Sequence, residues 1–395
     1  MSPRLDLLHP YPFQKLRQLF SDLTPNSALD HINLSIGEPK HPAPQLVKDA
    51  LMANLAGLSS YPATLGSEDL RQSISDWIAR RYNIAPPDAT TEVLPVNGSR
   101  EALFAFAQAV IDPSAERPTV LSPNPFYQIY EGAALLAGAE PWFVNCLAEN
   151  RFQPDWDSVP EEVWARTQLV FVCSPGNPTG AVASLADWER LFALSDRYGF
   201  VIASDECYSE IYFGEEKPLG GLEAAAKLGR DYTRLVMFSS LSKRSNVPGM
   251  RSGFVAGDAA IMAKFLLYRT YHGCAMSPMV MAASAAAWRD ESHVIENREQ
   301  YTAKFKAVTN QLASVLEVTL PDAAFYLWAK TPIDDEEFAR RLFTQEHVTV
   351  LPGSYLAREA HGVNPGKGYV RIALVAPLNE CIIAAERIVR FCKTL

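Results

Sequence analysis

Between Val93 and Gly257, short apolar runs alternate with longer stretches of helical periodicity, and this alternation constrains the fold more than any other feature of the sequence. The runs are rich in valine, leucine, isoleucine and phenylalanine, as is typical of buried strands. Strand alternating with helix predicts an α/β fold with a mostly parallel sheet sandwiched by helices. The predicted strands are 93–96, 119–121, 169–173, 200–203, 235–238 and 253–257, and the predicted helices between them are 99–111, 129–136 and 185–198.

After Gly257 the pattern changes to long helical stretches, followed by strand-like runs and a closing helix. We therefore expect two domains: a large domain, residues 36–279, and a smaller α+β domain in which residues 280–395 join the N-terminal arm, residues 1–35. The cleft between two such domains is the expected site. The further predicted helices are 13–20, two between 45 and 82, 259–272, 278–288, 297–315 and 379–392, and the further strands are 323–329, 348–351 and 369–374.

The composition excludes several classes of function. A chain of 395 residues that is 48% hydrophobic can bury two sizeable cores, and a net charge of −9 without a basic block argues against nucleic acid. The seven histidines and six cysteines form no HExxH, CxxC or Cys/His cluster, so we predict no metal site and reduced cysteines. The N-terminus does not read as a signal peptide and no apolar run could span a bilayer, so we expect a cytoplasmic protein without a membrane partner.

Lys243 follows the predicted strand 235–238 and stands among hydroxyls and an arginine. Open α/β sheets hold ligands at the carboxyl ends of their strands. Ser240, Ser242 and Arg251 flank the lysine, so the segment would place an amine among groups that bind anions. Such a lysine suits covalent attachment to a phosphorylated aldehyde, whereas the alternative is a solvated loop.

Two further segments follow predicted strands and supply what a phosphorylated pyridine aldehyde needs. Gly98 and Ser99 precede a helix, whose free N–H groups and positive end can hold a phosphate. Asp205 follows the strand 200–203 and could accept a hydrogen bond from a protonated ring nitrogen. A serine helix cap and an aspartate helix cap are the alternatives for these positions.

A third segment, 174–180, follows a predicted strand and forms a rigid turn of prolines and glycines. This turn can aim the Asn177 amide at a ring oxygen, although a plain turn is equally consistent locally. The turn 35–39 contains Gly37, which lets the backbone approach a ligand closely or is simply a turn glycine.

Arg371 lies inside the strand-like run 369–374. Burying a charge there is costly unless a carboxylate pairs with it. Because a guanidinium binds a carboxylate through two parallel hydrogen bonds, an amino-acid substrate would supply a suitable partner.

From about Ser35 to the C-terminus, the motifs that contain Lys243, Asp205, Asn177 and Ser99 resemble those of the fold-type I pyridoxal phosphate enzymes, in the class I/II aminotransferases. The resemblance implies that Lys243 binds the cofactor's aldehyde carbon and later moves a proton between that carbon and the substrate α-carbon, with Asp205 and Tyr208 as the other catalytic residues. The implied cofactor contacts are ring stacking by Tyr127, with Phe126 the second choice, ring-oxygen contacts from Tyr208 and Asn177, a ring-nitrogen partner in Asp205, and phosphate contacts from Gly98, Ser99, Arg100, Ser240, Ser242 and Arg251.

The same resemblance implies amino-acid and keto-acid substrates and a homodimer. Gly37, Asn177 and Arg371 would bind the substrate, and Tyr61 would reach the phosphate in the neighbouring subunit. Both ends of the expected substrates carry a carboxylate, so a second cation or further donors are needed. The candidates for that cation are Arg269, His272, Lys40 and Arg244.

Within the family, the segments 37–42, 124–130 and 240–251 look most like the N-succinyl-L,L-diaminopimelate aminotransferases of bacterial lysine biosynthesis. That resemblance implies exchange of an amino group between glutamate and N-succinyl-2-amino-6-oxopimelate. Aspartate, aromatic or broad-specificity transamination is the main alternative, and a β-carbon–sulfur lyase of the same fold is another. A regulatory protein that binds the cofactor would usually add a DNA-binding module, for which we see no room before Ser35.

Overall fold

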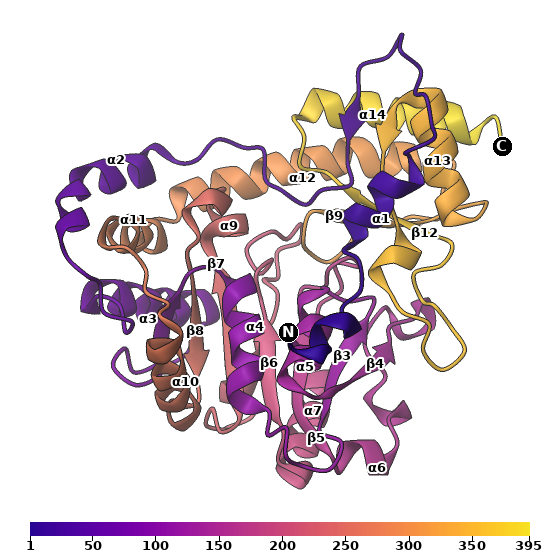
Figure 1. The fold of residues 1–395 in the computed structure, drawn as a ribbon. Coiled ribbons are helices and arrows are strands. Elements are labelled where there is room, and N and C mark those ends of the chain that lie inside the picture. Colours follow the sequence, from indigo (N-terminus) through magenta and orange to yellow (C-terminus); the bar gives the residue numbers. More distant parts are fainter.

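The computed structural model describes residues 1–395, and its main feature is a seven-stranded sheet with the strand order β2-β8-β7-β6-β5-β3-β4 (Figure 1). The strand β8 is antiparallel to both of its neighbours, and all other neighbouring strands are parallel. The predicted mostly parallel sheet is therefore confirmed. The strands are β2 (Val93–Val96), β3 (Thr119–Asn124), β4 (Glu140–Asn145), β5 (Thr167–Cys173), β6 (Val201–Asp205), β7 (Leu235–Ser240) and β8 (Gly253–Gly257).

Helices cover both faces of this sheet. Successive residues of a strand point to opposite faces, so Val236 and Val255 pack into one hydrophobic cluster while Met237 and Phe254 pack into another. Because both faces are buried, the strands read as continuous apolar runs. One cluster contains α4 (Ser99–Val110), α5 (Ile129–Ala137) and α10 (Ala259–His272), and the other contains α3 (Glu68–Tyr82), α7 (Leu185–Tyr198), α8 (Gly221–Lys227) and α11 (Pro278–Arg289).

A second sheet has three antiparallel strands in the order β11-β12-β9. Its hydrophobic cluster includes side chains of three helices. The N-terminal segment joins this part of the molecule, because β1 pairs in parallel with β10. The elements are β1 (Ile32–Asn33), β9 (Tyr326–Lys330), β10 (Val348–Thr349), β11 (Leu351–Pro352), β12 (Tyr369–Ala373), α12 (Ser292–Leu312), α13 (Asp335–Glu346) and α14 (Leu378–Cys392).

Most predicted elements are present, and the exceptions have physical reasons. The run 348–351 is not one strand: β10 pairs with β1 and β11 pairs with β12, so the chain changes partner at Val350. Three elements, β4, α8 and α13, were not predicted. The edge strand β4 is only half-buried and lacks the continuous apolar run by which the other strands were predicted. The other helices are α1 (Pro12–Leu19), α2 (Gln45–Ala53), α6 (Glu161–Trp164) and α9 (Leu241–Arg244), with 3-10 turns at Pro3–Leu7, Leu55–Ser59, Ala148–Asn150, Trp156–Ser158, Pro248–Met250 and Gly353–Leu356.

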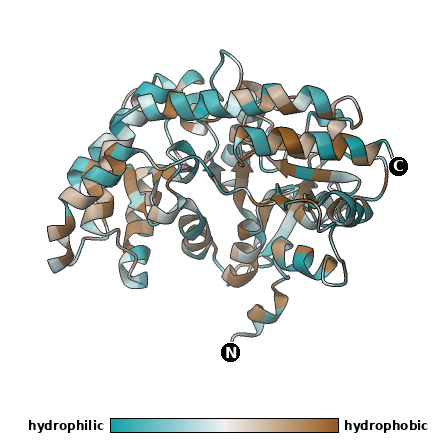
Figure 2. Ribbon diagram, turned by 90° about the horizontal axis from the view of Figure 1, so that it is seen from above, coloured by the Kyte–Doolittle hydropathy of each residue, from teal (hydrophilic) through white to brown (hydrophobic).

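The expected division at residue 279 stays a prediction, and α11 is the element that bears on it. This helix packs against α2 and α3, and its Met281 and Trp288 lie in a cluster of the seven-stranded sheet. In Figure 2 the helices seen from above carry both hydrophilic and hydrophobic residues, as expected of helices with one exposed and one buried face. None of the helices has the length and apolar composition needed to cross a membrane.

Candidate active site

A cleft of about 660 Å³ opens where the carboxyl ends of three parallel strands approach the three-stranded sheet. Cys173, Asp205 and Ser240 end the strands β5, β6 and β7, and all three line the cleft. Since parallel strands end at the same edge of a sheet, side chains that are far apart in sequence meet here. The lining includes Gly37, Ser99, Arg100, Tyr127, Asn177, Asp205, Tyr208, Ser240, Ser242, Lys243, Arg251 and Arg371 among the residues predicted from the sequence.

Lys243 lies in the short helix α9, directly after β7. The Ser240 hydroxyl caps this helix by accepting a hydrogen bond from the Ser242 N–H at 3.1 Å. The Lys243 ammonium donates to the Gly37 carbonyl at 2.5 Å and has no acidic partner. Burial lowers the pKa of Lys243 to about 8, so a sizeable fraction of this amine is neutral near physiological pH. A neutral amine is the form that can attack an aldehyde.

Asp205 is held at the end of β6 by two donors. Its Oδ2 accepts a hydrogen bond from the Tyr130 hydroxyl at 2.7 Å, and its Oδ1 accepts one from the Cys207 N–H at 3.3 Å. Burial raises the pKa of Asp205, and no cation of the protein pairs with it. A cationic ring nitrogen would supply the missing positive charge, so this carboxyl fits the pyridine ring of the predicted cofactor.

Tyr208 and Tyr326 form a hydroxyl pair with an oxygen separation of 2.8 Å. Burial raises the pKa of Tyr208, so its hydroxyl remains a hydrogen-bond donor at neutral pH. A side chain at Gly37 would collide with the Tyr326 hydroxyl, so packing requires a glycine at position 37. Tyr326 also lies beneath Arg371, whose guanidinium carbon is 4.4 Å from the ring centre.

Arg371 is buried in β12, yet it has no carboxylate partner. Its Nη1 donates to the Asn177 side-chain oxygen at 2.9 Å and its Nη2 donates to the Ser35 carbonyl at 2.7 Å, while its Nε has no hydrogen-bond partner. A buried guanidinium is normally paired with an acid, because its desolvation is costly. The arrangement therefore leaves a place for the carboxylate of a ligand in the cleft.

The residues expected around a phosphate form a cradle at the start of α4. Ser99 begins the helix, and the first N–H groups of a helix have no partner within it. Gly98 has a φ of 89°, and a side chain there would collide with the Arg251 guanidinium. The positive φ favours glycine at this position, its small size lets the guanidinium come close to the backbone, and both groups suit an anion.

Of the two aromatic candidates for ring stacking, only Tyr127 lines the cleft. Its hydroxyl accepts a hydrogen bond from Arg100 Nε at 2.5 Å, and burial raises its pKa. Phe126 is fully buried in a hydrophobic cluster and does not line the cleft, which favours Tyr127. Gly98 supports the cradle without lining the cleft, and Tyr61 is fully exposed in a loop outside it.

The four candidates for a second substrate-binding cation do not line the cleft of the single chain. Arg269 and Arg244 are buried and form ion pairs with Glu101 and Glu291. Lys40 pairs with Glu38 at 3.2 Å, and His272 contacts Cys274. The cleft residues that the sequence did not reveal include Tyr11, Cys207 and Tyr326, whose positions depend on packing between distant segments.

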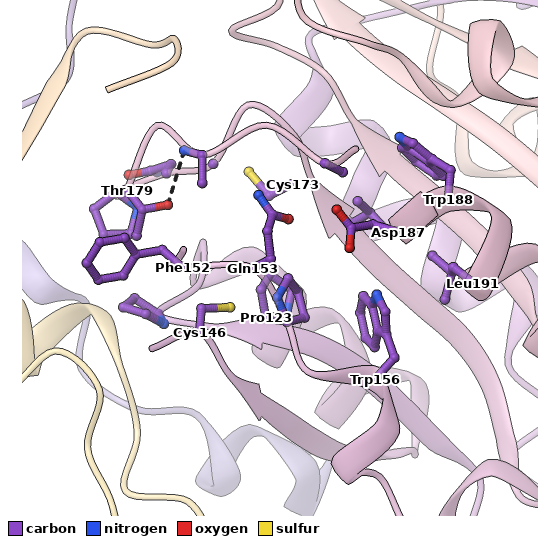
Figure 3. A pocket seen from close by; sticks show the side chains of 18 residues that line it. Pro123, Cys146, Phe152, Gln153, Trp156, Cys173, Thr179, Asp187, Trp188 and Leu191 are labelled. Atoms are coloured by element: carbon purple, nitrogen blue, oxygen red, sulfur yellow. Dashed lines mark hydrogen bonds between the residues drawn. The ribbon is translucent and has the colours of Figure 1, made fainter. Parts of the chain in front are cut away.

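A second, closed pocket of about 30 Å³ lies beside the Asn177 turn (Figure 3). Trp156, Trp188 and Phe152 line it, and it shares only Cys173 and Asn177 with the large cleft. It could hold a water molecule or two but no substrate. The large cleft is therefore the candidate active site.

Comparison with known proteins shows to which family the chain belongs. The family model described as aminotransferase class I and II matches residues 30–388, so the chain belongs to that family. It is accordingly a pyridoxal phosphate-dependent aminotransferase with the α/β architecture of that family.

Particular relatives are similar over nearly the whole chain. LL-diaminopimelate aminotransferase of Aquifex aeolicus is 33% identical over 393 residues, which cover 98% of each chain. The crystal structure of an aminotransferase from Neisseria meningitidis is 56% identical, with a TM-score of 0.97 and 99% of each chain covered. A probable N-succinyldiaminopimelate aminotransferase from Thermus thermophilus is 28% identical, with a TM-score of 0.83 and coverage of 96% of this chain and 98% of that one.

Proposed function

We propose that the protein transfers an amino group between glutamate and N-succinyl-2-amino-6-oxopimelate, a step of lysine biosynthesis. The single observation that carries the proposal is that Lys243 and Arg371 line the same cleft: one supplies a partly neutral amine and the other a buried guanidinium without an acidic partner. An amino acid would bring its α-carboxylate to Arg371 and its α-carbon toward Lys243.

Pyridoxal phosphate fits the remaining groups of the cleft. Asp205 would hold the ring nitrogen, Tyr127 would stack on the ring, and Asn177 and Tyr208 would contact the ring oxygen. The phosphate would be held by Gly98, Ser99, Arg100, Ser240, Ser242 and Arg251. When bound, the cofactor supplies the electron sink that stabilises negative charge at the substrate α-carbon.

The protein's own groups would then bind, orient and move protons. Lys243, once free of the cofactor, would take the proton from the substrate α-carbon and pass it to the cofactor's aldehyde carbon. This is general acid–base catalysis, for which an amine with a pKa of about 8 is suited. Tyr208 would hold the ring oxygen through its hydroxyl, which Tyr326 orients. Arg371, with Asn177 and the backbone at Gly37, would fix the carboxylate.

Tyr11 is our candidate for recognising the far end of the substrate. It lines the cleft from the N-terminal arm, and its buried hydroxyl has no hydrogen-bond partner. An unpaired buried donor is costly unless a ligand satisfies it. A succinyl group carries carbonyl and carboxylate oxygens that could accept this hydrogen bond.

LL-diaminopimelate, which lacks the succinyl group, is the second candidate substrate. The reason is that LL-diaminopimelate aminotransferase of Aquifex aeolicus is 33% identical to this chain. The far end of LL-diaminopimelate carries a carboxylate and a cationic amine, whereas in the succinylated substrate that amine is an amide that ends in an additional carboxylate. Glu38, which lines the cleft and pairs with Lys40, could accept such an amine.

A spectroscopic titration followed by a substrate comparison tests the proposal. The cofactor absorbance of the loaded enzyme should shift to shorter wavelength on addition of glutamate, and N-succinyl-L,L-diaminopimelate with 2-oxoglutarate should then give the highest kcat/KM for glutamate formation. Higher kcat/KM with LL-diaminopimelate, aspartate or tyrosine would reject the succinylated substrate. Release of pyruvate and ammonia from cystathionine would instead indicate the lyase.

Tyr11→Phe sharpens this comparison. If the Tyr11 hydroxyl binds the succinyl group, the variant should raise KM for the succinylated substrate about fivefold to tenfold and leave KM for glutamate unchanged. Tyr198→Phe, which alters a hydroxyl near Glu161 outside the cleft, is the matched control. Equal changes in KM for both substrates would show that Tyr11 does not recognise the far end.

We further propose that the enzyme is a homodimer in which Tyr61 reaches the neighbouring site. Tyr61 is fully exposed, and Met52, Leu55 and Leu58 are exposed beside it in sequence. Several large exposed apolar side chains within one short segment are consistent with an interface. Sedimentation should give twice the chain mass, and Tyr61→Phe should weaken binding of the cofactor. A monomer with full activity would reject this assembly.

We place the reaction in the cytoplasm. All six cysteines are free, and none of them forms a disulfide with another. Free buried cysteines are typical of a reducing compartment. Fractionation of cells that express the chain with its native N-terminus would test this placement, and recovery in an oxidising compartment would contradict it.

A further inference from the structure

Three side chains with metal-binding atoms gather outside the cleft. His272 ends α10, Gly273 caps the helix with a φ of 85°, and Cys274 follows. The His272 Nδ1 lies 2.7 Å from the Cys274 sulfur, and that sulfur lies 3.1 Å from Oε1 of Glu101, in the first turn of α4. The left-handed glycine turns the chain so that the side chains on either side of it meet the carboxylate of another helix.

The three ligand types together suit zinc and related ions. Thiolate sulfur, imidazole nitrogen and carboxylate oxygen are its usual donors, and one atom from each residue lies within 4.8 Å of the others. A tetrahedral zinc site separates sulfur and nitrogen ligands by about 3.5 Å. The observed separations are shorter, and since His272 is exposed, its ring can move outward to admit an ion.

The surroundings of Glu101 support an ion in this position. Arg269 donates to Glu101 Oε1 at 2.6 Å, while Oε2 is buried and has no hydrogen-bond partner. Metal-binding carboxylates are commonly oriented by a second donor. Because Arg269 and the Cys274 sulfur both contact Oε1, the unpartnered Oε2 is the oxygen available to an ion. A carboxylate and a thiolate carry two negative charges, which balance the charge of a divalent cation, so binding of the ion would release the thiol proton and reduce the attraction between Glu101 and Arg269.

We propose that Glu101, His272 and Cys274 form a binding site for a divalent transition-metal ion of the Zn²⁺ type. Three protein ligands leave a fourth position for water, and the exposed His272 gives the ion a path from solvent. None of the three residues lines the active-site cleft of its own chain.

Cobalt is the probe for this site, because Co²⁺ bound to a thiolate in tetrahedral geometry has intense ligand-field bands at the red end of the visible spectrum. The full-length, cofactor-loaded enzyme should bind one Co²⁺ per chain with such a spectrum, and Zn²⁺ should displace it whereas Mg²⁺ should not. His272→Gln and Cys274→Ser should each weaken Co²⁺ binding by tenfold or more, since even the loss of a residue that only orients a ligand commonly costs about 10- to 100-fold.

The controls separate this site from unspecific binding. Cys392→Ser changes a half-buried cysteine at the other end of the chain and should leave the cobalt spectrum unchanged. His272 is exposed, so its variant tests the site even if Cys274→Ser disturbs packing. Absence of a tetrahedral cobalt spectrum, or a spectrum that survives in both ligand variants, would overturn the proposal.

Discussion

Two groups of buried cations in this molecule are built differently. In the core, Arg81 is packed with Glu210 and also donates to the Ser209 carbonyl at 2.8 Å, while Arg244 pairs with Glu291 at 2.8 Å. In the cleft, Arg371 and Lys243 have carbonyl and amide partners but no carboxylate. The core cations are therefore neutralised within the fold, whereas the cleft cations are not.

The difference shows how a cation for binding can be told from a cation for stability. Burial acts to raise the pKa of Glu210, but the adjacent Arg81 charge holds that pKa below its usual value, so the pair is complete without a ligand. At Lys243, burial lowers the pKa, and the charges of Arg371 and Arg100 lower it further, because no acid forms an ion pair with the amine. We infer that the cleft accepts an electrostatic cost in the empty enzyme that an anionic substrate and the cofactor remove.

The largest expected effect is that of Lys243→Ala on activity. If this amine is both the attachment point and the proton carrier, transamination should fall by at least about 10⁴-fold, while the far-ultraviolet circular dichroism stays unchanged. Lys227→Ala is the control, since Lys227 is an exposed lysine paired with Glu223. Appreciable turnover by the Lys243 variant would contradict the view that the cleft cations serve catalysis whereas the core cations serve stability.

Arg81→Gln should reduce stability and leave substrate binding unchanged. Removing the guanidinium leaves Glu210 buried with only the more distant Arg298, so the free energy of unfolding should fall by about 3–5 kcal/mol in a urea titration. Adding Glu210→Gln should restore part of that loss, because the uncompensated charge is then gone. A variant with normal stability would show that the core pair contributes nothing to folding.

Arg371→Gln should weaken substrate binding and leave the stability of the fold unchanged or higher. The guanidinium binds a carboxylate only when substrate is present, so kcat/KM should fall roughly 10- to 100-fold through KM, which corresponds to about 1.5–3 kcal/mol for a charged hydrogen bond. Stability should be unchanged or higher, since no acid is left behind. Steady-state kinetics and urea unfolding of the same preparation decide this; a loss of stability as large as that for Arg81 would contradict the account.

The rate at which the cofactor attaches to the empty enzyme should depend on pH through Lys243. Only the neutral amine attacks the aldehyde, and its fraction rises with pH until the pKa of about 8 is passed. The attachment rate should thus rise about tenfold per pH unit below about 8 and level off above it. Stopped-flow absorbance measures this rate. A rise that continued to the ordinary pKa of a lysine would show that burial does not act on Lys243.

Tyr130→Phe should have the smallest effect. It removes the hydroxyl that donates to Asp205 at 2.7 Å, which makes the ionised carboxylate less favourable and weakens its hold on the ring nitrogen. A loss of about 1 kcal/mol would raise the dissociation constant of the cofactor about fivefold. Fluorescence titration of the empty enzyme measures that constant. An unchanged constant would mean that the Cys207 N–H suffices to orient Asp205.

Much of the fold and of the site was predictable because both depend on local patterns. The helices 185–198 and 259–272 were predicted to the residue, since their apolar periodicity and flanking cap residues lie within a single stretch of sequence. Lys243, Asp205 and Asn177 each follow an apolar strand, and parallel strands bring their ends together.

What the sequence did not reveal depends on contacts between distant segments. Tyr326 matters because it packs against Gly37 and Tyr208, and Glu101 meets His272 and Cys274 only once α4 and α10 lie together. The sequence could not show that the four candidates for a second cation have partners of their own, because sequence spacing does not show which groups meet inside the fold.

Reductive trapping of the cofactor tests the central claim most directly. The loaded enzyme is treated with borohydride, digested and mapped by mass spectrometry, so that the lysine joined to the cofactor is identified. The account predicts that the added mass falls on Lys243 and that addition of glutamate before the borohydride reduces the labelling. Label on a different lysine, or no label with cofactor in excess, would contradict the assignment of the cleft around Lys243 and Arg371 as the active site.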